Sequence, residues 1–134
     1  MSLAEKDRQA IVKYRLGKAK NLFAQIPVFI ENKFYATAAN RLYYTCYHAV
    51  TALLINDGYK AQTHSGVKTL LGLHYITQNK IEKSYGKIYN QLFNLRQSGD
   101  YEDLFEVDEE DIIPLIEPAK KFIVEIENLI NKNS

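Results

Sequence analysis

The stretch YATAANRLYYTCYHAVTALLIND, residues 35–57, decides the fold of this chain. Its apolar side chains recur at intervals of three and four residues, which is the period of an α-helix, and Gly58 follows as a residue suited to end a helix. One face holds Leu42, Cys46, Ala49, Val50, Leu53 and Leu54, and it is widened by Tyr43 and Tyr47. The remaining face holds Arg41, Tyr44, Thr45, His48, Ala52 and Ile55. A helix that is apolar or aromatic nearly all round lies at the centre of a bundle, so we expect this second face to contact another helix or another subunit.

Four further stretches have the same helical period, and no alternating stretch is long enough to predict a strand. They cover about residues 3–31, a segment after the N-cap candidate Thr63, about residues 81–97, and the segment from about Asp108 onward. The connections between them are short, which favours antiparallel neighbours. The sequence therefore predicts one all-α domain over residues 1–134, an up-and-down bundle of four or five helices.

The helix ends carry more specific signals. Pro27 predicts a kink or an early end of the first helix, because proline lacks the backbone donor and crowds the preceding turn. Turn residues at 98–100 predict the end of the fourth helix. Asp108 and Asp111 are spaced as in a capping box at the start of the fifth helix. Pro114 and Pro118 favour an irregular or late start of that helix.

Composition limits the class of protein. The chain is 46% hydrophobic and 25% charged, as in an ordinary globular domain, and its single cysteine, Cys46, cannot form an internal disulfide. No apolar run reaches the ~18 residues of a membrane span, so we expect a soluble, cytoplasmic protein. Residues 1–60 hold nine Lys or Arg and four Asp or Glu, whereas residues 101–134 hold three and ten. The basic part suits a phosphate-bearing or acidic partner, and the acidic part suits a solvated helix start.

Two motifs could carry chemistry. Arg41, Tyr44 and His48 share one helical face, where a guanidinium, a phenol and an imidazole could bind phosphate and move a proton. The alternative is a buried polar cluster that satisfies itself. His64 follows Thr63 at a predicted helix start, whose free N–H groups could hold an anion, although ordinary capping explains the same residues.

A third motif, Arg96 followed by Asp100 and Tyr101, could be a structural ion pair at a helix end. Metal chemistry has little support, because His48, His64 and His74 show no ligand spacing. Cys46 and His48 are two residues apart on one helix, so they point in different directions and do not form a nucleophile–base pair. We therefore expect no metal and no cofactor.

Together these motifs resemble the HEPN family. The run from Phe34 to Ala49 resembles its pattern of small residues, then Arg-x-Tyr-Tyr, then an aromatic–His pair. Residues 63–67, Thr-His-Ser-Gly-Val, resemble its next block, and residues 95–101, Leu-Arg-Gln-Ser-Gly-Asp-Tyr, resemble its Arg-x-x-x-Asp-Tyr block. The three blocks occur in the family's order and cover nearly the whole chain. The resemblance is greatest to the small stand-alone HEPN proteins of bacteria and archaea.

The resemblance implies an up-and-down helical bundle that usually forms a homodimer. Members of the family are often encoded beside a minimal nucleotidyltransferase, as a toxin–antitoxin or nucleotide-handling pair. Many are metal-independent RNases with an Arg, four to six intervening residues and a His. Counted from Arg96, the positions for that His hold Tyr101, Glu102 and Asp103. Because a phenol is a poor base at neutral pH, the sequence departs from the family's RNase pattern here, unless His48 or His64 takes the place of the missing His.

Three functions compete at this stage. The first is a binding or regulatory module that takes a nucleotide, an RNA or a nucleotidyltransferase partner. The second is an RNase toxin that uses Arg96 with Tyr101 or with His48 as catalytic candidates, and the third is a protein-interaction scaffold without a ligand. We favour the first, a non-enzymatic module. Its candidate phosphate- or nucleotide-binding residues are Arg41, Tyr44, His48, His64, Arg96, Asp100 and Tyr101.

Overall fold

The computed structural model of the chain describes residues 4–101 and 106–132, and for residues 97–101 it describes the backbone alone. Within these residues the chain forms helices and no strand. The elements are α1 (Glu5–Glu31), α2 (Tyr35–Asn56), α3 (His64–Leu71), the π-helix η1 (Gly72–Ile76), α4 (Lys83–Tyr101) and α5 (Glu109–Lys132). The predicted all-α fold class is confirmed.

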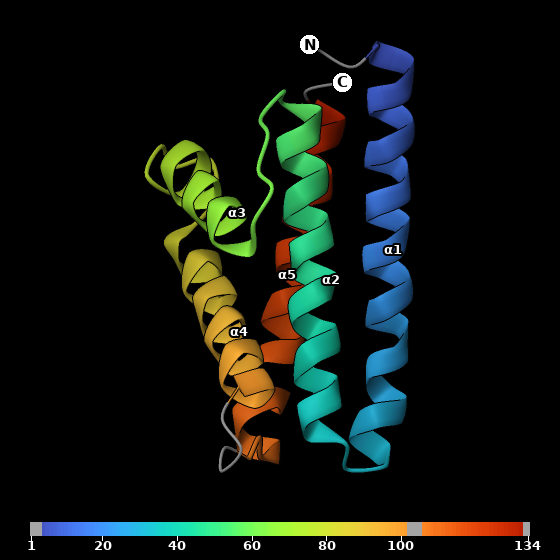
Figure 1. Ribbon diagram of the computed structural model, residues 1–134, viewed down its shortest axis with the longest axis vertical. Helices are drawn as coiled ribbons and strands as arrows, with labels where there is room; N and C mark the ends of the chain where they lie inside the picture. Colours follow the sequence, from blue (N-terminus) through green and yellow to red (C-terminus); the bar gives the residue numbers. More distant parts are fainter. Residues whose placement is uncertain (1–3, 102–105, 133–134) are drawn as a thin grey trace.

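The four long helices run up and down in chain order, and α3 lies beside the bundle near the C-terminal end of α2 (Figure 1). Helix α2 packs against α1, α3, α4 and α5, so its predicted central place is confirmed. On its second face Thr45 and Ala52 are fully buried within one chain. The apolar circumference of α2 is therefore covered at these positions without another subunit.

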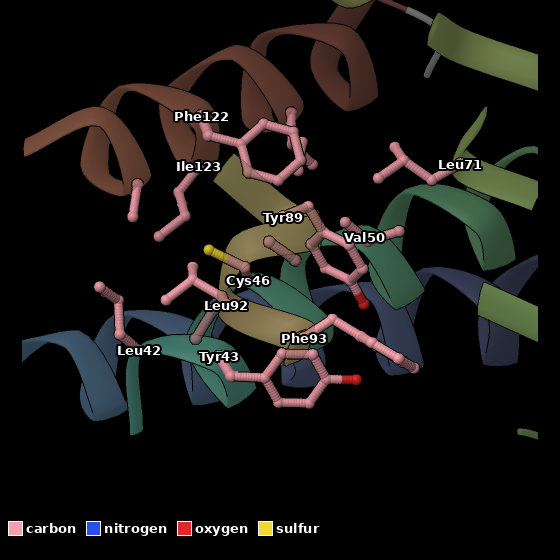
Figure 2. Packing of buried hydrophobic residues seen from close by; sticks show 14 of the residues in the cluster. Leu42, Tyr43, Cys46, Val50, Leu71, Tyr89, Leu92, Phe93, Phe122 and Ile123 are labelled. Atoms are coloured by element: carbon pink, nitrogen blue, oxygen red, sulfur yellow. The ribbon is translucent and has the colours of Figure 1, made fainter. Parts of the chain in front are cut away.

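The core forms where α2, α4 and α5 meet (Figure 2). Tyr43, Tyr89 and Phe122 are among its largest fully buried side chains. Cys46 lies in the same cluster, and burial raises the pKa of its thiol to about 12. A thiol in this state is an apolar packing group with little reactivity.

Local sequence signals explain the predicted helix ends. Gly58 has φ +86° and follows the C-cap Asp57, and hydrogen bonds from Gly58 N to Ile55 O and from Tyr59 N to Leu54 O complete a Schellman motif. At the start of α3 the Thr63 hydroxyl accepts from Gly66 N at 2.9 Å. These caps fix the segment between α2 and α3.

At the start of α5, the structure confirms one of the two hydrogen bonds of the predicted capping box, the one that the N3 side chain accepts. The carboxylate of Asp111 accepts a hydrogen bond from the backbone N–H of Asp108 at 2.9 Å. In a capping box the side chain at N3 reaches back to the backbone of the N-cap residue in this way. Helix α5 accordingly begins directly after Asp108, at Glu109.

Three predicted features of the helix ends are wrong: the early end of the first helix at Pro27, the late start of the fifth helix at Pro114 and Pro118, and the end of the fourth helix at residues 98–100. Helix α1 continues through Pro27 to Glu31, and α5 continues through Pro114 and Pro118. A proline costs an internal hydrogen bond, but the packed apolar stripe of a long helix offsets that loss. Helix α4 also runs past residues 98–100 to Tyr101, because one glycine in a helix costs only about 1 kcal/mol. The π-helical turn η1 had no signal in the sequence.

Candidate functional site

His64 lies at the start of α3, against the tyrosines of α2. The Tyr43 hydroxyl and His64 Nδ1 are 2.7 Å apart, and the rings of Tyr47 and His64 have centroids 4.5 Å apart. The Tyr44 ring meets the same imidazole edge-on at 5.7 Å. Because Thr63 caps α3, the direction in which His64 leaves the backbone is fixed.

Arg96 of α4 covers the same tyrosines. Its guanidinium carbon lies 5.7 Å from the ring centroid of Tyr43 and 5.8 Å from that of Tyr44, within the range of cation–π attraction. Tyr43 is fully buried, whereas Tyr44, His64 and Arg96 are half-buried. We call Tyr43, Tyr44, Tyr47, His64 and Arg96 the aromatic cluster. The Tyr43 ring is its buried base, and its other members are half-buried.

The electrostatics of the aromatic cluster keep His64 neutral. Burial, and then the charge of Arg96, lower the pKa of the His64 imidazole. Burial also raises the pKa of the Tyr43 phenol to about 12. When His64 carries its proton on Nε2, the Tyr43 hydroxyl donates to Nδ1. That tautomer leaves Nε2–H for a second partner.

His48 lies one turn along α2 from Tyr44 and is held from the other side by α1. Arg15 Nη1 donates to His48 Nδ1 at 2.9 Å, because a guanidinium can only donate. Burial, followed by the charges of Arg15 and Lys18, lowers the pKa of His48 to about 4. The imidazole is therefore neutral at physiological pH with its proton on Nε2. Its ring centroid lies 5.7 Å from that of Tyr47, which joins it to the aromatic cluster.

The structure brings together four of the residues predicted from the sequence. Tyr44, His48, His64 and Arg96 form one connected group of side chains. His64 lies at the centre of this group. The side chains of Asp100 and Tyr101 lie outside the described residues.

Arg41 is directed elsewhere. Its guanidinium lies over the Phe29 ring at 5.8 Å and donates to Asn40 Oδ1 at 2.8 Å. It shares with Arg96 only the lining of a pocket of about 370 Å³ beside Leu95 and Val107. Helical spacing places Arg41 on the same face of α2 as Tyr44. Its long side chain instead lies over Phe29, near the end of α1.

Sequence reasoning gave no site role to Tyr43, Tyr47 or Arg15. Tyr43 and Tyr47 were interpreted as core residues, and Tyr43 is indeed buried, but its hydroxyl reaches His64. The signal that could have found it is the polar end of a tyrosine, which needs a partner when buried. Arg15 is 33 residues from His48 in the chain, so no local spacing links them.

Two further observations concern metals and membranes. Among the described residues, no three His, Cys, Asp or Glu side chains gather as a metal site requires. None of the helices in residues 4–101 and 106–132 is long and apolar enough to cross a membrane.

The arrangement defines a class of protein: an all-α bundle with a half-buried cluster of aromatic, imidazole and guanidinium groups on one side of its central helix. The HEPN domain family matches residues 12–129, and the chain belongs to this family. It is 32% identical to a UPF0332 protein of Thermotoga maritima over 92% of this chain and 94% of that one. It is 28% identical to a Methanocaldococcus jannaschii protein named a "putative toxin", over 98% and 97%. A UPF0332 protein of Archaeoglobus fulgidus is 28% identical over 89% and 94%.

Proposed function

We propose that this chain is an RNA-binding HEPN module of the toxin kind, and that the aromatic cluster holds the RNA. The observation that carries the proposal is Arg96 stacked over Tyr43 and Tyr44 beside a neutral His64. A guanidinium binds phosphate oxygens through its fork of N–H donors, and a half-buried aromatic ring can stack on a base. His64 Nε2–H and His48 Nε2–H add neutral donors for phosphate or ribose oxygens.

Single-stranded RNA suits the cluster better than a duplex. Rings that stack on bases need bases that are not already stacked on each other, as in loops and single strands. The proposal includes a nucleotide as a minimal ligand, because one base and one phosphate would use the same groups. Arg96 and His64 are its central residues, followed by Tyr44 and His48. Arg41 contacts Phe29 and Asn40 and is not a central residue of this proposal.

The names of the relatives support the toxin part of the proposal. Two Methanocaldococcus jannaschii proteins that match this chain are named putative toxins. A toxin is usually paired with a neutralising partner, and for this family we propose a minimal nucleotidyltransferase, with a homodimer as the binding form and the cytoplasm as the location. Light scattering of the purified protein measures the first point: a homodimer gives twice the 15.5 kDa of the chain.

Metal-independent RNA cleavage is the second candidate function. It is favoured by His64, whose lowered pKa leaves a neutral imidazole beside a permanent cation. This role needs the other tautomer of His64, in which Nδ1–H donates to the Tyr43 hydroxyl and Nε2 is free to act as a general base on a ribose hydroxyl while the cation holds the phosphate. His48 is a weaker candidate, because Arg15 occupies its Nδ1. Burial, followed by the charges of Arg15 and Lys18, also lowers its pKa to about 4. Cleavage of RNA that continues in EDTA and is lost in His64→Ala, but not in His74→Ala, would establish this function.

Fluorescence anisotropy with a short single-stranded RNA tests binding. Arg96→Ala should weaken binding by roughly tenfold or more, because a charge-assisted contact to phosphate contributes about 1.5–3 kcal/mol. Lys87→Ala is the matched control, because it removes a cation from the same helix. Lys87 precedes Arg96 by nine residues, or about two and a half turns, so it faces the opposite side of α4. Circular dichroism checks that both variants remain helical. Equal losses in the two variants, or no binding by the native chain, would refute the proposal.

A further inference from the structure

A pocket of about 480 Å³ lies between the first half of α1, the end of α2 and the segment that leads to α3. Its volume falls in the range of small-molecule sites, about 300–1,000 Å³. Leu54 and Ile55 of α2 and Val67 of α3 supply apolar wall, and Tyr59 adds an aromatic ring. The Schellman motif at Gly58 shapes one side of it. The pocket is distinct from the one that Arg41 and Arg96 line.

Positive charge dominates this pocket. Arg8, Arg15 and Lys60 line it, and no carboxylate does so among the described residues. Arg8 has an ion pair with Glu5, but the separation is 3.8 Å and the Glu5 side chain is 68% exposed. A long, solvated pair of this kind contributes little. The guanidinium groups are therefore poorly neutralised by the chain itself.

Arg15 is the group that points most clearly to a ligand. Within the described residues its polar partner is the neutral imidazole of His48, through one of its five N–H donors. A half-buried guanidinium next to a neutral acceptor loses hydration without gaining a counter-charge. A bound anion would provide that charge, and the fork of donors suits the oxygens of a phosphate.

We propose that this pocket binds a phosphate monoester that carries an apolar or aromatic body. Arg15 and Arg8 hold the phosphate, and the Leu54–Ile55 wall and the Tyr59 ring cover the body. The ligand is a free mononucleotide or the terminal phosphate of an RNA strand, which share this chemistry. Because Arg15 contacts both the pocket and His48, an occupied pocket changes the hydrogen bond that fixes His48. Arg8 and Arg15 differ from Arg96, the phosphate contact of the aromatic cluster, so separate substitutions test the two sites.

Calorimetric titration of the full chain with adenosine 5′-monophosphate, adenosine and inorganic phosphate tests the pocket. The monophosphate should bind saturably, adenosine at least roughly tenfold more weakly, and phosphate alone weakly, since each lacks one half of the recognised chemistry. Arg15→Gln and Arg8→Ala should each weaken the monophosphate by roughly tenfold. Short RNAs with and without a 5′-phosphate show whether the ligand is a free mononucleotide or the end of an RNA strand. If it is the end of a strand, the 5′-phosphorylated RNA should bind more tightly than the mononucleotide.

Lys13→Ala is the matched control, because it removes a cation of α1 between Arg8 and Arg15 that lines a different pocket. It should leave the affinity unchanged. Arg96→Ala removes any monophosphate bound at the aromatic cluster, so the binding that remains in Arg96→Ala and is lost in Arg15→Gln belongs to this pocket. A second readout is the His48 imidazole resonance, which should shift on addition of the monophosphate in the native chain. Absence of saturable binding, equal loss in Lys13→Ala and Arg8→Ala, or loss of binding in Arg96→Ala alone would overturn the proposal.

Discussion

At the scale of single residues, burial, followed by the charges of Arg15 and Lys18, keeps His48 neutral. The folded chain holds the His48 pKa at about 4, whereas an unfolded histidine titrates near pH ~6.5. Between these two values the unfolded chain binds more protons than the folded chain, so the free energy of unfolding falls as the pH falls. Above pH ~6.5 the effect is absent, because the imidazole is neutral in both states.

We therefore expect the native chain to lose stability through His48 on acidification from about pH 7 to about pH 4. The full shift would correspond to ~3 kcal/mol, but His48 is half-exposed and solvent screening reduces this to about 1–2 kcal/mol. His48→Gln keeps an acceptor for Arg15 and cannot titrate. Urea unfolding of both proteins across this range should show a steeper loss for the native chain. Parallel curves would mean that His48 does not titrate as described.

We expect opposite effects on the free energy of unfolding when phenylalanine replaces either of two buried tyrosines, Tyr75 and Tyr89. The Tyr75 hydroxyl donates to Asp57 Oδ2 at 2.5 Å, and burial followed by this carboxylate raises the Tyr75 pKa. The Tyr89 hydroxyl is buried and makes no hydrogen bond of good geometry among the described residues, although it interacts with the Tyr43 phenol. Tyr75→Phe should lower the free energy of unfolding by about 1–3 kcal/mol, because it leaves a carboxylate without its donor. Tyr89→Phe should be neutral or stabilising, and chemical denaturation of the pair would reveal the contrast.

The same residues show how far the sequence could predict the site. Tyr44 and His48 share a face because they are four apart on one helix, and periodicity reveals that. The approach of His64 and Arg96 to that face depends on how α3 and α4 pack, which local spacing does not show. Arg15 was missed because its partner lies on another helix, and Arg41 was misplaced because Phe29 attracts its guanidinium.

At the scale of helices, the sequence predicts the capping residues, but it does not show whether a helix continues past a proline or a glycine. Gly58, Thr63 and Asp111 act through neighbours within three or four residues, so their patterns can be recognised in the chain. Whether a helix continues through Pro27 or Gly99 depends on the total packing of its apolar stripe. That quantity is a property of the folded bundle, and no single residue in the sequence reveals it.

The end of α2 offers a direct test with two glycines. Gly58 has φ +86°, so Gly58→Ala should lower the free energy of unfolding by about 1 kcal/mol even though an added Cβ meets no atom. Gly17 lies inside α1, and a Cβ there also meets nothing within 4 Å. Gly17→Ala should raise stability by about 0.5–1 kcal/mol. Thermal unfolding that moves in the same direction for both variants would contradict the Schellman assignment.

At the scale of the whole molecule, charge is separated along the bundle. The acidic start of α5, with Asp108, Glu109, Glu110 and Asp111, lies at the end where α1 turns into α2 (Figure 1). The pocket of Arg8 and Arg15 lies along the first half of α1, toward the opposite end. An RNA strand is repelled by the acidic end and attracted by the basic one. This polarity was visible in the sequence as basic and acidic segments, and the up-and-down order of the helices turns it into a polarity in space.

The salt dependence of RNA binding tests the central claim most directly, because it reports contacts between cations and phosphates. For a single strand, each phosphate contact adds about 0.7 to the slope of log Kd against log salt concentration. If Arg96 of the aromatic cluster holds a phosphate, Arg96→Ala should lower that slope by about 0.7, and Lys87→Ala should leave it unchanged. An Arg96→Ala slope equal to that of the native chain would contradict the account.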